Sequence, residues 1–302
     1  MTIDQQPVAP AGPAVVAPVA PSRGTSAQRM AWATFLRKPT TMVFAPLLIL
    51  MVLFVVAVPF FGPSPILTVF PVMSPPNPDH MLGTDQLGRD FLVRVANGGR
   101  VSLMVGFAVA LLCMTIGLVV GGAAGYYRGV VDLGLVKIAE FFQVLPAIVL
   151  ALVAVALLGD GMWLVVVILA ITMWPAVARI VRAEAMRISQ MGYVESARAV
   201  GIPGFRIILS DVIPNLMPPV LVATTLTVGR AILIESGLAY IGIGDPNNPS
   251  WGTLLADAQG HMRDGWWLAV IPGACIFAVV LAVNLLGDAL NDSFNPMIGR
   301  VK

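Results

Sequence analysis

Residues 101–127 read VSLMVGFAVALLCMTIGLVVGGAAGYY and contain no charged side chain. A stretch of about 20 apolar residues crosses the roughly 30 Å hydrocarbon core of a bilayer at about 1.5 Å per helical residue. Lipid offers no water to bond exposed backbone groups, so such a segment must be helical. The stretch therefore predicts a membrane-spanning helix. Gly117, Gly121 and Gly125 lie four residues apart within it, which predicts one face where another backbone approaches closely.

Five further segments are long and apolar enough to cross. They are residues 41–61, 138–158, 162–181, 216–241 and 266–286. The sequence thus predicts an all-α polytopic membrane protein with six transmembrane helices.

The composition agrees with a membrane environment. Hydrophobic residues make up 58% of the chain and charged residues 11%, with a mean hydropathy of +0.87. A soluble domain has about 25% charged residues. The net charge of +2, without a basic cluster interleaved with aromatics, argues against a nucleic-acid partner.

The distribution of Lys and Arg predicts the orientation. With a cytoplasmic N-terminus, thirteen of the eighteen basic residues lie inside and four outside, so both termini are expected in the cytoplasm. Residues 62–100 and 242–265 then form outer loops, and residues 182–215 form a cytoplasmic loop.

Four parts follow along the chain. Residues 1–40 are rich in Pro and Ala and are expected to be a disordered cytoplasmic tail, to which no function is assigned. Residues 41–100 hold the first span and an outer loop, residues 101–290 form the core with its cytoplasmic loop, and residues 291–302 form a cytoplasmic C-terminal tail.

Catalytic chemistry has little support. None of the lysines follows a glycine, so the phosphate-binding loop of an ATPase is absent. Cys113 and Cys275 lie in apolar runs without metal-ligand spacing, and His80 and His261 fall in the outer loops, where surface positions explain them better than a shared metal site. No enzyme activity and no metal site are predicted.

The cytoplasmic loop contains residues 193–204, YVESARAVGIPG. A short helix is expected to end at Gly201, which can adopt the left-handed conformation, with Pro203 preventing its continuation. A second short helix is expected over residues 205–212, ending at Pro214. From the residues alone, a docking element and a plain connecting loop are equally good interpretations.

Residues 195–197 (Glu-Ser-Ala), Gly201 and residues 213–215 (Ile-Pro-Asn) resemble the Glu-Ala-Ala…Gly…Leu-Pro loop of ABC importer permeases. In that family the loop docks into the ATPase subunit. The resemblance implies a type I permease fold, with Glu195, Ala197 and Gly201 as the contact core. Arg198 and Pro214 belong to the same candidate surface. Ser196 and Asp211 depart from the usual Ala and His, which affects the electrostatics of docking.

Five other motifs follow in the order found in dipeptide, oligopeptide and nickel importer permeases, of the DppC/OppC type. They are residues 80–90 (HMLGTDQLGRD), 99–103 (GRVSL), 235–244 (ESGLAYIGIG), 249–252 (PSWG) and 284–288 (NLLGD). The resemblance covers residues 41 to 296.

The resemblance implies a bacterial inner-membrane permease subunit that forms half of a pore for peptides. Its expected partners are a second homologous permease, one or two ATP-binding subunits that carry ATP and Mg, and an extracytoplasmic solute-binding protein. No cofactor is expected in this chain. Nickel and haem are alternative cargoes, and an ion-coupled secondary transporter or a channel is the alternative of another class. Whether the ATPases are fused stays open.

Charged residues near the path are further candidates. Arg230 and Glu235 are predicted on the translocation path, with a structural ion pair as the alternative, because a charge inside the hydrocarbon must face water or a partner. Candidates for an outer gate or binding-protein contact are Gly83, Thr84, Asp85, Gly88, Arg89, Asp90 and Trp251. For Thr84, Asp85, Arg89 and Asp90 the favoured interpretation is a tight hydrogen-bonded turn that caps the next helix. Trp251, Trp266 and Trp267 are expected to lie in an interfacial aromatic belt.

Overall fold

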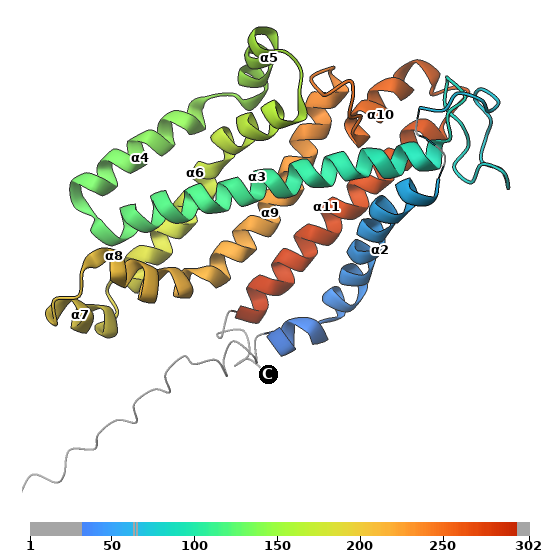
Figure 1. The fold of residues 1–302 in the computed structure, drawn as a ribbon. Helices are drawn as coiled ribbons and strands as arrows, with labels where there is room; N and C mark the ends of the chain where they lie inside the picture. Colours follow the sequence, from blue (N-terminus) through green and yellow to red (C-terminus); the bar gives the residue numbers. More distant parts are fainter. Residues whose placement is uncertain (1–31, 63, 65, 295–302) are drawn as a thin grey trace, which may run out of the picture.

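The computed structural model describes residues 32–62, 64 and 66–294, which form an elongated bundle of helices (Figure 1). The helices are α2 (Pro39–Phe61), α3 (Phe91–Tyr127), α4 (Gly129–Val144), α5 (Ala147–Leu158), α6 (Met162–Ile188), α7 (Gly192–Ala199), α8 (Gly204–Ile207), α9 (Ile213–Tyr240), α10 (Trp251–Ala258) and α11 (Trp267–Phe294). A π-helical turn (Ile208–Val212) joins α8 to α9, and a 3₁₀ turn (Gln259–His261) follows α10. Within these residues the all-α class is confirmed.

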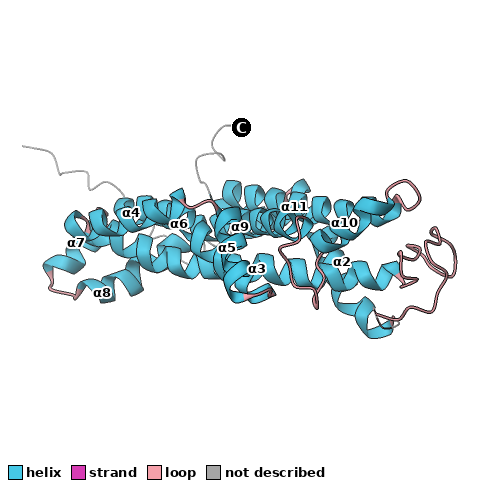
Figure 2. Cartoon of the chain, turned by 90° about the horizontal axis from the view of Figure 1, so that it is seen from above, coloured by secondary structure: helices cyan, strands magenta, loops and turns pink. Residues whose placement is uncertain are grey.

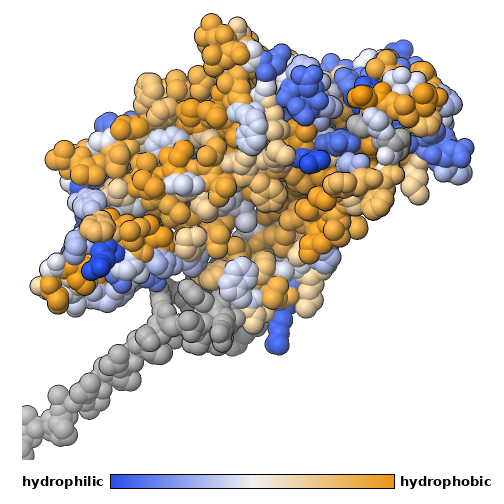
Figure 3. All heavy atoms as spheres, in the orientation of Figure 1, coloured by the Kyte–Doolittle hydropathy of each residue, from blue (hydrophilic) through white to orange (hydrophobic). Residues whose placement is uncertain are grey.

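Five of the helices are long and apolar enough to cross a membrane, and a sixth span results if α4 and α5 count as one. Polar side chains gather at the two ends of the bundle, and an apolar band lies between them (Figure 3). Seen from above, α7 and α8 lie at one end and the long loops at the other (Figure 2).

The third predicted span is not straight. Helices α4 and α5 meet at a bend of 77°. Leu145 and Pro146 between them adopt extended backbone conformations, because proline cannot continue the helix and disfavours helical geometry in the preceding residue. The bond between Asp132 and the Arg182 guanidinium, 2.6 Å long, ties α4 to α6.

Helix α3 packs along α6 through the glycine stripe that the sequence predicts. A Cβ at Gly125 would lie 2.6 Å from the Arg182 carbonyl oxygen, and one at Gly117 would lie 2.7 Å from Val177. The predicted close approach of two backbones is therefore confirmed, and the partner helix is α6.

Several of the helix boundaries predicted from the sequence are wrong. Helix α3 begins ten residues before the predicted span, because Asp90 caps it by accepting a hydrogen bond from the Val93 amide. Helix α11 extends to Phe294, and residues 32–37 are helical although they were assigned to a disordered tail. The rest of that tail and of the C-terminal tail, residues 1–31 and 295–302, lies outside the described residues.

Two buried clusters form the core. One joins α3, α6 and α9 and includes Val194 of α7 and Ile207 of α8. The other joins α2, α3, α10 and α11 around Trp251. Helix α9 also contributes Val228 and Ile232 to this second cluster, so α3 and α9 both take part in the two clusters and are the central helices of the bundle.

Candidate functional site

The short helices α7 and α8 form a hairpin at one end of the bundle, called here the coupling hairpin (Gly192–Ile207). Gly201 has a φ of +85°. Its amide donates to the Arg198 carbonyl at 2.9 Å, and the Ile202 amide donates to the Ala197 carbonyl at 3.1 Å. This pair of bonds is the Schellman termination of a helix, and it turns the chain sharply after α7.

The coupling hairpin is anchored by a few side chains. Val194 and Ile207 are fully buried against the bundle. The Arg198 guanidinium lies 4.5 Å from the centre of the Tyr126 ring, and its Nε donates to the Tyr126 hydroxyl at 3.3 Å. The hairpin is thereby attached to the C-terminal end of α3.

The remaining hairpin surface is open. Glu195, Ser196, Arg198 and Gly201 are exposed, and Ala197 is half-buried. The Ser196 hydroxyl donates to the Gly192 carbonyl at 2.8 Å, so the residue that replaces the family's usual alanine fits within the helix. A rigid, capped turn with small exposed residues is suited to enter a groove on another protein.

The expected second short helix is wrong in one respect. Pro214 does not end it, because α8, the π-helical turn and α9 run on as one helix from Gly204 to Tyr240. Pro214 lies in the first turn of α9, where its missing amide disturbs little, and the π-helical turn absorbs the change of register. Asp211 lies in that turn and accepts a hydrogen bond from Ser210 at 2.6 Å.

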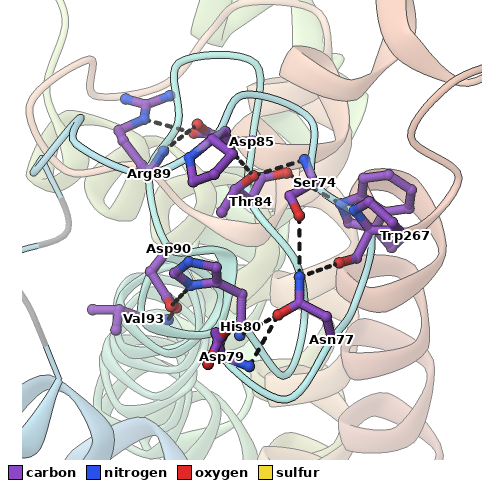
Figure 4. A network of polar contacts seen from close by, with 12 residues as sticks. Ser74, Asn77, Asp79, His80, Thr84, Asp85, Arg89, Asp90, Val93 and Trp267 are labelled. Carbon is purple, nitrogen blue, oxygen red and sulfur yellow. Dashed lines mark hydrogen bonds and ion pairs between the residues drawn. The ribbon is translucent and has the colours of Figure 1, made fainter.

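The loop before α3, which the sequence predicts to be an outer loop, is held by a polar network (Figure 4). Thr84 donates to the Pro71 carbonyl at 2.5 Å and accepts from the Ser74 amide at 2.9 Å. The Trp267 indole donates to the Thr84 carbonyl at 3.2 Å. Asp90 caps α3 and contacts His80 Nδ1 at 3.0 Å, so the predicted hydrogen-bonded cap is confirmed.

Asp85 is the centre of this network. Its Oδ2 accepts from Arg89 Nε and from Arg94 Nη1, each at 2.6 Å, and Oδ1 accepts from the Leu87 and Arg89 amides. Burial raises the pKa of Asp85, but the two amide bonds and the charge of Arg94 outweigh burial, so its pKa lies below the ordinary value of 3.8. Asp85 is therefore a buried, ionised carboxylate.

Arg94 extends the network to a distant part of the chain. Its Nη2 donates to Asp257 of α10 at 3.1 Å, while the Arg94 side chain is only 6% exposed. The outer loop, α3 and α10 are joined through this one guanidinium. The sequence analysis places Arg94 among the charges of the predicted outer loop and does not predict that it joins Asp85 to Asp257. The signal available in the sequence is that Arg94 lies four residues after Asp90, the residue that caps α3, and so falls within the helix.

Gly83 and Gly88 of the loop have φ values of +77° and +68°. A Cβ at Gly83 would also lie 2.6 Å from the Ser74 carbonyl oxygen. Both positions require glycine, so these residues shape the loop instead of presenting side chains to a partner.

The predicted tryptophan belt is wrong for two of its three members. Trp251 is 0% exposed and Trp267 is 3% exposed, whereas Trp266 is 57% exposed. The Trp251 indole donates to the Val95 carbonyl at 2.9 Å, and its amide donates to the Ser102 hydroxyl at 3.2 Å. A buried, hydrogen-bonded Trp251 fixes α10 on α3 and does not present its ring to lipid or to a partner.

The two predicted path residues separate in space. Glu235 is 5% exposed and accepts from the Ser102 and Ser236 hydroxyls, each at 3.3 Å. Arg230 is exposed on the open side of α9. Glu235 thus belongs to the contact among α3, α9 and α10, and the two residues do not form a pair.

Residues 115–300 match the family described as "Binding-protein-dependent transport system inner membrane component". The chain belongs to this family. It is 37% identical to the dipeptide transport system permease protein DppC of Bacillus subtilis (strain 168) over 269 residues, 87% of this chain and 84% of the relative. It is 38% identical to the glutathione transport system permease protein GsiD of Pectobacterium atrosepticum over 74% of each chain.

A solved structure of the MetNI methionine ABC transporter has the same fold as this permease. The match has a TM-score of 0.56 and 19% identity and covers 67% of this chain and 96% of that one. The chain therefore has the type I permease fold, and it is a multi-pass inner-membrane transport subunit.

Proposed function

We propose that this permease imports dipeptides and short oligopeptides as half of an ATP-driven pore. Relatives named for dipeptide, di/tripeptide, oligopeptide and glutathione transport cover between 72% and 87% of this chain at 35–38% identity. Peptide cargo is thus favoured over nickel or haem, which would use the same architecture.

The observation that carries the coupling role is the exposed hairpin and its rigid connection to the core. The coupling hairpin continues through the π-helical turn into α9, and the resulting helix reaches the outer end, where Glu235 is bonded to Ser102. An ATPase subunit that moves the hairpin would therefore tilt α9. ATP and Mg are supplied by that partner, and both chain termini lie in the cytoplasm.

A second permease is expected against the bent pair α4 and α5. Helix α4 has no buried residue and α5 has only Ala151. Large apolar side chains such as Val130, Val144 and Leu157 are 87%, 80% and 77% exposed. Apolar surface of this extent is covered by lipid or by another membrane chain.

The test is uptake of radiolabelled alanyl-alanine by proteoliposomes that contain the co-expressed importer and its binding protein. We expect uptake that requires ATP on the ATPase side and that unlabelled peptide suppresses. Uptake that persists without ATP and collapses with the proton gradient would instead establish a secondary transporter. ATP-dependent uptake of nickel or haem in place of the peptide would overturn the peptide cargo alone.

A further inference from the structure

The outer half of α9 has one uncovered face, called here the α9 stripe. Its members are Leu226, Arg230, Leu233, Gly237 and Tyr240. They follow a spacing of four and three residues, and every other residue between Leu226 and Tyr240 is buried or half-buried. A 4-3-4-3 spacing marks a single narrow line along a helix.

The α9 stripe is narrow because neighbouring helices cover the rest of α9. Gly229 faces Asn284 of α11, Ile232 fills the space beside Gly106 of α3, and Ser236 lies against Gly252 of α10. The stripe therefore lies on the side of α9 that these three neighbours do not cover.

The α9 stripe differs in chemistry from the other open faces of the bundle. The exposed side chains along the middle of α3 and α11, such as Phe107, Leu111 and Phe277, are apolar and suit lipid. The α9 stripe carries the guanidinium of Arg230 about one helical turn after Leu226, about 15 Å along the helix from Tyr240. At that depth a charge facing hydrocarbon is unfavourable by several kcal/mol, so this face borders water or an anion.

Arg230 has no anionic partner within the described residues. None of the ion pairs formed between residues 32 and 294 includes it. Glu235, the nearest carboxylate in the sequence of α9, is buried and bonded to Ser102 and Ser236. The guanidinium group of Arg230 is therefore free to bind a carboxylate from outside the chain.

We propose that the α9 stripe lines the translocation path and that Arg230 binds the carboxylate group of the passing peptide. The assignment rests on the proposed function, because free peptides carry a carboxylate whatever their side chains. Guanidinium and carboxylate match in a two-pronged, charge-assisted geometry. Gly237 lies about two turns after Arg230, and a Cβ there would meet no neighbouring atom within 4 Å, so the stripe is open at that level. The Tyr240 ring, 40% exposed, ends the stripe.

The experiment replaces Arg230 with cysteine in the complete importer and measures ATP-dependent uptake of alanyl-alanine. We expect uptake to fall by about tenfold or more, the effect of losing one hydrogen bond to a charged group. Modification with 2-aminoethyl methanethiosulfonate, which restores a positive charge, should recover part of the uptake, and the anionic sulfonatoethyl reagent should recover none. Alanyl-alanine should slow the modification.

Two control variants accompany it. Arg230→Lys retains the charge without the two-pronged geometry, so its uptake should lie between that of Arg230→Cys and that of the unaltered chain. Arg263→Cys removes an exposed arginine of the outer loop and should leave uptake unchanged. The unaltered assembly treated with either reagent reports on all other cysteines, including the buried Cys113 and Cys275.

Three results would overturn the inference. One is full uptake by Arg230→Cys. Another is modification that alanyl-alanine does not slow, which would remove the residue from the path. The third is loss of the second permease from the purified Arg230→Cys complex, which would make Arg230 part of an ion pair between chains. Failure of the unaltered assembly to import alanyl-alanine would refute the proposed peptide function itself.

Discussion

Replacing Gly201 with alanine is expected to weaken docking of the ATPase without disturbing the membrane bundle. The φ of +85° at Gly201 lies in the left-handed region, where an alanine costs about 1–2 kcal/mol. No atom lies within 4 Å of the position of a Cβ there, so the effect is conformational and not a clash within the chain. A cost of about 1–2 kcal/mol reduces the equilibrium constant for forming the capped hairpin by a factor of roughly 5–30.

The assay is binding of the purified ATPase to the permease in nanodiscs, with uptake measured in parallel. The apparent affinity of Gly201→Ala should fall measurably, by at most about 5–30-fold, if docking requires the capped hairpin. Gly192→Ala is the matched control, because Gly192 begins α7, also has open space around it and has no left-handed φ. Asparagine tolerates the left-handed region, so Gly201→Asn should fall between alanine and the unaltered chain.

The reasoning is refuted if Gly201→Ala binds the ATPase as tightly as Gly192→Ala does. A loss of the bundle's thermal stability in Gly201→Ala would also contradict it. The structure places this residue at an exposed turn away from the two buried clusters.

Three further predictions concern the outer end and the core. Arg94→Met leaves the buried Asp85 with one fewer cation and should destabilise the protein by about 3 kcal/mol, seen as a lower midpoint of thermal unfolding in detergent. Because folding lowers the pKa of Asp85, its ionised carboxylate stabilises the folded protein at pH values above the ordinary pKa of 3.8, and this stabilisation is lost as the pH falls through the lower pKa of the folded state. Asp85→Asn should therefore make the stability of the protein less dependent on pH in the acid range. An unchanged dependence on pH would contradict this prediction. Trp251→Ala removes a fully buried ring and should cost about 3–5 kcal/mol, whereas the exposed Trp266→Ala should cost far less in the same melt.

The spans and the end of the short helix at Gly201 could be predicted because they depend on local sequence. Residues 101–127 are apolar enough to identify a membrane helix, and Gly201 followed by Pro203 identifies the end of a helix. The glycine stripe correctly predicted a close helix contact, although only the fold shows that α6 is the partner.

The errors arise where distant residues decide the outcome. Trp251 was assigned to the membrane interface by residue type, but its indole is satisfied by the Val95 carbonyl, more than 150 residues earlier in the chain. Arg94 looked like a loop charge because the sequence does not show that Asp85 and Asp257 converge on it. From the sequence, Arg230 and Glu235 are both charged residues within one predicted span. Only the packing of α9 shows that Arg230 is exposed and that Glu235 is buried.

The central claim is that this chain is one half of an importer and docks an ATPase through the coupling hairpin. The most direct measurement is purification of the tagged chain in mild detergent, with identification of every co-purifying protein by mass spectrometry. The account predicts recovery of a second permease of the same family and of a protein with a phosphate-binding loop, the latter reduced in the Gly201→Ala variant. A lone, stable chain that transports solute by itself in liposomes would contradict it.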